Sequence, residues 1–219
     1  MPSSGLVVGN GEKARMWVKD SALPNTTKAA LSSFIDRFPT LTFYREESMW
    51  LDSIEGRLQI TLPRWFRAIR QTLTFAMPDH YIWARFHQSQ HPHLSDEELR
   101  RRWYTVNLIG APSRSERALL ERMQGIRPYP IGRDETPGGS TFAINLSDAT
   151  DQRVFEYGSE FLMEEDLEGN PIEEAVNPMF GSYADMIGHI DALKMIAKVD
   201  ADGIDDKHWP SMVVIEAQG

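Results

Sequence analysis

Apolar residues recur at helical spacing in three segments of the N-terminal third, which predicts amphipathic helices there. The expected helices span residues 27–37, 49–58 and 64–73. Residues with cap or stop chemistry bound them: Asn25 or Thr26 before the first, Ser48 before the second and Pro63 before the third. The predicted buried stripes hold Ala30, Leu31, Phe34, Phe38, Trp50, Leu51, Ile54, Leu58, Trp65, Phe66, Ile69 and Leu73.

Shorter apolar runs predict strands elsewhere in the chain. An Asn10-Gly11 pair separates residues 6–8 from residues 15–18, which is typical of a hairpin. Further strands are expected over residues 75–86, 141–146, 154–157, 161–163 and 212–215, and residues 106–109 extend a helix or form a strand. A five-residue turn, 148–152, joins the second and third of these strands.

Three other segments carry weaker signals. Ser95 and Glu98 form a capping box that predicts a helix of undefined length, and residues 114–122 suit a loop or short helix. Residues 183–198 follow helical spacing after a Gly-Ser start. Because helices precede strands and a helix follows, we predict an α+β fold: N-terminal helices, a central antiparallel twisted sheet and a closing C-terminal helix.

Composition narrows the class of protein. The chain has 219 residues, is 41% apolar, and has a formal net charge of -9, so a sizeable core is possible and binding to nucleic acid or anionic lipid is not expected. It has no cysteine, which removes disulfides and thiolate chemistry. Without a signal-peptide pattern or a spanning apolar run, we expect a cytoplasmic protein.

Negative charge is concentrated in residues 134–185, the acidic segment, which holds thirteen Asp and Glu against a single Arg, Arg153. Such a surface attracts cationic partners, so we predict a protein-binding face, although an ordinary solvated face would give the same charge run. The candidate partner-binding residues are Asp134, Glu135, Asp148, Asp151, Glu156, Tyr157, Glu160, Glu164, Glu165, Asp166 and Glu168. Tyr157 belongs to this set because an outward aromatic among carboxylates is a typical hot spot.

Catalytic and metal-binding patterns are weaker. His87, His91 and His93 have a spacing that suits a metal on a helix, but Pro92 breaks any helix there. Residues 200–206 lack the glycine and glutamate positions of a calcium loop. No nucleophile elbow or phosphate loop is present, so we predict no enzyme activity and no cofactor. The cationic residues Arg64, Arg67 and Arg70, and residues 100–102, are expected to face water.

Three segments in order resemble the SUKH superfamily, which contains bacterial toxin-immunity proteins and a fungal regulator of cell-wall synthesis. The first, residues 50–73, resembles the family's opening helix pair. The second, residues 129–157, is similar to its strand core, and the third, residues 181–193, to its closing helix. The matching residues are Ile54, Glu55, Leu58, Leu62-Pro63, Trp65-Phe66, Pro130, Ile131-Gly132, Asp134-Glu135, Gly138-Gly139, Phe142 to Leu146 and Val154-Phe155.

The resemblance implies a SUKH-like domain over residues 41–198, an N-terminal extension over 1–40 (a hairpin plus a helix) and a C-terminal tail over 199–219 with a possible edge strand. It implies a non-enzymatic immunity protein that blocks a cognate toxin, often a nuclease, made by the same cell. The acidic charge agrees with a toxin that has a basic surface. A regulatory scaffold and a metal-dependent hydrolase using the histidine loop remain the alternatives.

Overall fold

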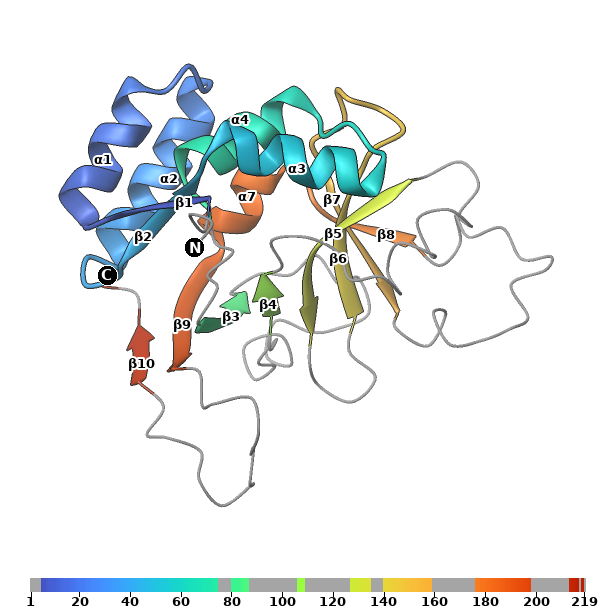
Figure 1. The fold of residues 1–219 in the computed structure, drawn as a ribbon. Coiled ribbons are helices and arrows are strands. Elements are labelled where there is room, and N and C mark those ends of the chain that lie inside the picture. Colours follow the sequence, from blue (N-terminus) through green and yellow to red (C-terminus); the bar gives the residue numbers. More distant parts are fainter. Residues whose placement is uncertain are drawn as a thin grey trace.

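The computed structural model of the protein (Figure 1) describes residues 5–74, 80–86, 106–108, 127–134, 140–158, 176–197, 213–216 and 218. The fold belongs to the α+β class, as predicted. The helices gather on one side together with a two-stranded sheet, and the three- and five-stranded antiparallel sheets lie on the other (Figure 1). Several segments discussed above lie outside the described residues: 87–93, 114–122, 161–163, 164–174, 200–206 and the helix expected to open at Ser95.

Five helices form a helical layer. They are α1 Gly11–Asp20, α2 Asn25–Arg37, α3 Ser48–Leu58, α4 Arg64–Thr72 and α7 Tyr183–Gly188. The three N-terminal helices predicted from spacing are confirmed, and most of their apolar stripes are buried. Trp50 is the exception, because it lies on the first turn of α3 and remains 37% exposed. Ile35, absent from the predicted stripe, is buried in α2.

The predicted N-terminal hairpin is wrong, because Asn10 begins a helix instead of a turn. Its side-chain Oδ1 accepts a hydrogen bond from the Lys13 backbone N–H at 3.0 Å, which caps α1. The preceding strand, β1 Leu6–Gly9, pairs antiparallel with β2 Phe43–Glu46, more than thirty residues along the chain. The Asn-Gly signal therefore marks a strand-to-helix junction.

A five-stranded antiparallel sheet contains the described strands of the acidic segment. Its strands, in spatial order, are β4 Val106–Leu108, β5 Pro128–Asp134, β6 Ser140–Asn145, β7 Val154–Gly158 and β8 Val176–Phe180. The predicted strand pair joined by the 148–152 turn is confirmed as β6 and β7, with Ser140 opposite Gly158. Neighbouring strands follow chain order, so each connection is local.

The predicted long helix over residues 183–198 is wrong beyond Gly188. Ser182 caps α7 by accepting a hydrogen bond from the Asp185 N–H, but the chain then enters strand β9 Ile190–Ala197. β9 pairs with β3 His80–Phe86 on one side and β10 Val213–Glu216 on the other. Hydrogen bonds to these two flanking strands satisfy the backbone groups of β9. This pairing decides the structure, because the apolar spacing of residues 190–197 suits a helix and a strand alike. The expected strands near 75–86 and 212–215 are its partners, with β10 at the edge.

A cluster of buried apolar residues joins the helical layer to the sheet. Leu31 and Phe34 of α2 belong to the same cluster as Phe142 of β6 and Ile187 of α7. Residues 14–38 therefore contribute to the same core as residues 41–190.

Arg37, at the end of α2, ties two distant parts of the chain together. Its guanidinium donates to the Ile187 and Ile190 carbonyls, while the Arg37 carbonyl accepts from the Gln218 N–H at 3.0 Å. Gln218 is thereby held beside the end of α2, close to the C-terminus in Figure 1.

Candidate partner-binding surface

The strand register divides the acidic candidates between the two ends of the five-stranded sheet. Ser140 lies opposite Gly158, and Tyr157 lies opposite Val176, so residues 135–139 and 159–175 both connect strands at one end. The β6–β7 turn lies at the other end, beside the helical layer (Figure 1). The chain therefore brings Asp148 and Asp151 together, but separates them from the candidates that follow β5 and β7.

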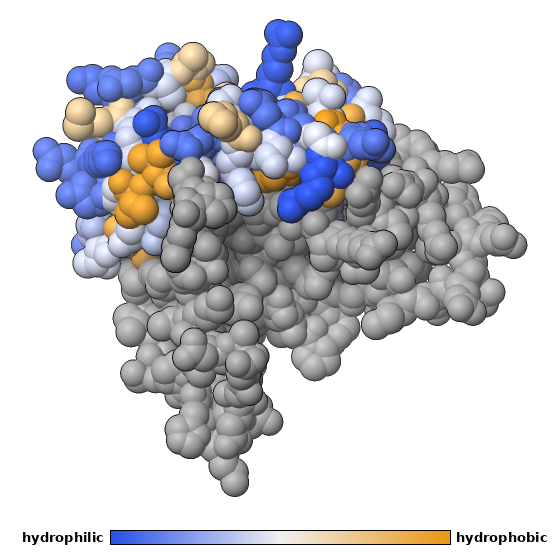
Figure 2. Space-filling model, viewed as in Figure 1, coloured by the Kyte–Doolittle hydropathy of each residue, from blue (hydrophilic) through white to orange (hydrophobic). Residues whose placement is uncertain are grey.

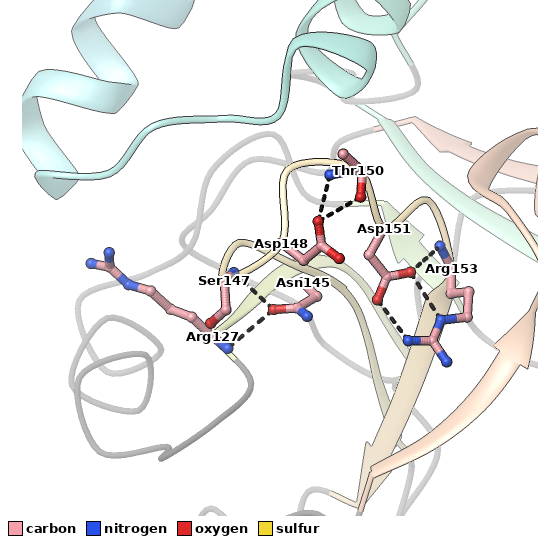
Figure 3. Close-up of polar contacts among 7 residues, drawn as sticks. All are labelled: Arg127, Asn145, Ser147, Asp148, Thr150, Asp151 and Arg153. Atoms are coloured by element: carbon pink, nitrogen blue, oxygen red, sulfur yellow. Dashed lines mark hydrogen bonds and ion pairs between the residues drawn. The ribbon is translucent and has the colours of Figure 1, made fainter.

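Side-chain hydrogen bonds to the backbone hold the β6–β7 turn in one conformation (Figure 3). Asn145 Oδ1 accepts from the Arg127 N–H at 3.3 Å and from the Ser147 N–H at 2.8 Å. Asp148 Oδ1 accepts from the Thr150 N–H at 2.8 Å and from its hydroxyl at 2.6 Å. The Thr150 hydroxyl is the main cause of a lowered pKa at Asp148, so this exposed carboxylate stays ionised in mild acid.

Asp151 differs from Asp148, because a neighbouring cation compensates its charge. Arg153 donates to both carboxylate oxygens of Asp151 at 2.9 Å, and the Arg153 N–H adds a third bond at 3.1 Å (Figure 3). This hydrogen bonding lowers the pKa of Asp151. The Asp151 side chain is only 7% exposed, so Asp148 is the more accessible carboxylate of the turn.

Glu156 and Tyr157 do not belong to the exposed surface, contrary to the expectation for them. They are 4% and 2% exposed, and Val154 and Phe155 on the same strand are also buried. β7 is thus covered on both faces, whereas period-two alternation would leave one face in water. Of Asp134 only the backbone is described, at the end of β5, and Glu135, Glu160, Glu164, Glu165, Asp166 and Glu168 lie outside the described residues.

A buried polar cluster supports the sheet from the helical layer, and the sequence analysis missed it. Arg70 of α4 forms an ion pair with Glu46 of β2 and donates to the Tyr129 hydroxyl of β5 at 3.2 Å. Its side chain is 4% exposed, so the expectation that Arg70 faces water is wrong. The spacing did contain this signal: Arg70 follows Phe66 by four residues and precedes Leu73 by three, which places it on the buried stripe.

Burial dominates the electrostatics of this cluster. Burial raises the pKa of Glu46, although the charge of Arg70 opposes the shift. Among the described residues, the Oε2 atom of Glu46 has no hydrogen-bond partner. Burial likewise raises the pKa of Tyr129 and of Tyr183, the first residue of α7. The Phe66 ring packs against both tyrosines, with centroids 6.0 and 5.3 Å away. The cluster is a structural junction of β2, α4, β5 and α7.

The described residues hold no group of three or more His, Cys, Asp or Glu placed to bind a metal ion. The loop that carries His87, His91 and His93 lies outside them. Among the helices of the described ranges, none has the length and apolar character needed to cross a membrane. Comparison with family models, curated proteins and solved structures finds no match to the chain.

Proposed function

We propose that this is a non-enzymatic binding protein of the immunity type, which neutralises a cognate toxin in the cytoplasm through an acidic surface. The observation that carries the proposal is the charge of the acidic segment, thirteen Asp and Glu against one Arg, on consecutive strands and connections around β6 and β7. A toxin that binds phosphate groups has a basic surface, which such a segment can occupy. The resemblance to the SUKH superfamily supports a non-enzymatic binding protein, and the acidic charge favours an immunity protein over a regulatory scaffold.

The end of the sheet where β5 meets β6 and β7 meets β8 is the proposed docking end. Nine of the thirteen acidic residues fall at or between these strand ends, including Asp134, Glu135, Glu164 and Glu165. Concentrated charge of one sign accelerates encounter with an oppositely charged protein by about 10- to 1,000-fold at low salt. Fast association suits a protein that must capture a toxin before it acts.

Neutralisation can be tested with the cognate toxin, which we expect to be the product of the neighbouring gene. Its C-terminal region should arrest growth when expressed alone and lose this effect when this protein is co-expressed. Purified, the two should form a stable complex whose association rate falls steeply with salt, because steering is screened over about 10 Å at 0.1 M salt. A complex with a salt-independent association rate would contradict the electrostatic proposal.

Charge-reversal variants distinguish the effect of the acidic docking end on the association rate from the effect of the protein's net charge. The double variant Glu164→Lys/Glu165→Lys should slow association with the toxin about tenfold or more. The matched control, Glu12→Lys/Asp20→Lys, makes the same change in net charge at two exposed positions of α1. Equal slowing in both variants would attribute the effect to net charge, and no slowing in either would exclude the acidic docking end.

A further inference from the structure

The outer edge of β1 has the backbone geometry of an acceptor strand. The Glu47 N–H donates to the Gly5 carbonyl at 2.8 Å, so this opposed pair is hydrogen-bonded. Hydrogen-bonded and non-hydrogen-bonded pairs alternate in an antiparallel ladder, which makes Val7 and Gly9 bond to β2. The N–H and C=O groups of Leu6 and Val8 must then point away from β2.

Two further contacts agree with this assignment. Tyr44 lies opposite Val8, and its carbonyl points away from β1. There it accepts a hydrogen bond from the Thr74 N–H at 2.7 Å. The Val8 carbonyl accepts from Lys13 Nζ at 3.1 Å, which is possible only if it points outward. In the part of the chain that the structure describes, no strand other than β2 pairs with β1.

Side chains around this edge combine apolar surface with positive charge. Val8 is 53% exposed. The Trp17 ring lies between two cations, with Lys13 Nζ 5.6 Å and the Arg45 guanidinium carbon 5.0 Å from its centroid. Figure 2 shows apolar surface interspersed with strongly hydrophilic surface on this helical side of the molecule.

We propose that the β1 edge binds an extended acidic segment of another protein by strand addition, a second interaction separate from the acidic docking end. The outward groups of Leu6 and Val8 would supply the backbone hydrogen bonds. Acidic side chains of the added strand would meet Lys13 and Arg45 on the Trp17 face of β1, while its apolar residues, on the opposite face, cover Val8. A second copy of this chain is disfavoured, because pairing of two β1 strands would bring the cationic pairs together.

Backbone hydrogen exchange tests the proposal on the unmodified protein. The probe is a capped hexapeptide of alternating glutamate and valine, with a lysine–valine hexapeptide as its charge-reversed control. In the free protein the Val7 and Gly9 amides should exchange slowly and the Leu6 and Val8 amides fast. Saturation with the acidic peptide should slow exchange at Leu6 and Val8 by at least about tenfold, and the basic peptide should leave it unchanged.

Two variants test separately how much the backbone hydrogen bonds and the cationic side chains contribute to peptide binding. Val8→Pro removes an outward N–H that β2 does not use, so it should weaken peptide binding about tenfold more than Val8→Ala, which loses only apolar contact. Lys13→Glu/Arg45→Glu should weaken binding about tenfold, and Lys19→Glu, on another face of α1, should not.

Several results would overturn the proposal. These are Leu6 and Val8 amides that are already protected in the free monomer, equal binding of the two peptides, or a peptide affinity that Val8→Pro leaves unchanged. Protection of the same amides by concentration-dependent dimerisation alone would assign the edge to a second copy instead.

Discussion

Arg70 and Glu46 show how a buried pair depends on both partners. Arg70→Met leaves the Glu46 carboxylate buried without its cation, and we expect a loss of about 3–5 kcal/mol in the free energy of unfolding at pH 7. Arg15→Met, which breaks an exposed pair with Asp36, should cost no more than about 1 kcal/mol. Urea denaturation of both variants measures the difference, and similar losses would contradict the assigned burial.

The same pair has a defined pH dependence. The folded-state pKa of Glu46 lies above its ordinary value of 4.5, so protonated Glu46 is favoured by folding, and its stabilising contribution is lost as pH rises through the folded pKa. The deficit of Arg70→Met should therefore shrink when unfolding is measured near pH 4, where Glu46 no longer needs a cation. A deficit that grows in acid would contradict a raised pKa at Glu46.

At the scale of elements, the Asn10 cap explains why a hairpin signal gives a helix. Asn10→Ala removes the bond to the Lys13 N–H and should destabilise the protein by about 0.5–2 kcal/mol. Asn25→Ala changes the first residue of α2, where no side-chain cap bond exists, and should cost less than about 0.5 kcal/mol. Thermal denaturation of the pair distinguishes a cap from a general effect of losing asparagine.

Local elements were predictable from the sequence, and those that depend on distant pairing were not. Helices α2 to α4 follow from apolar spacing and the β6–β7 hairpin from its turn residues, all within a short window. The caps expected at Asn25 or Thr26 and at Ser48 are wrong, because neither α2 nor α3 has a side-chain cap bond. β9 depends on β3, more than a hundred residues earlier, and its apolar run suits both structures. The candidate site divides in the same way: Asp148 is exposed as expected, whereas Glu156 is buried because both faces of β7 are covered.

At the scale of the whole molecule, two buried tyrosines should make the fold sensitive to alkali. Burial raises the pKa of Tyr129 and Tyr183 above the ordinary value of 10, so their stabilising contributions are present below pH 10 and lost as pH rises. Each can remove up to about 1.4 kcal/mol per pH unit above that value. Denaturation midpoints should therefore fall as pH rises above 10, and Tyr183→Phe should flatten that decline. An unchanged slope in that variant would contradict the burial of Tyr183.

The bond between the Gln218 N–H and the Arg37 carbonyl determines how the protein can be attached to a sensor surface. A biotin tag at the C-terminus would leave the molecule beside α2 and orient the five-stranded sheet toward the injected toxin (Figure 1). A tag at the N-terminus would instead be linked to the chain a few residues before Leu6 and would crowd the edge of β1. Immobilisation through the C-terminus is therefore the orientation that leaves the five-stranded sheet free to bind on the chip.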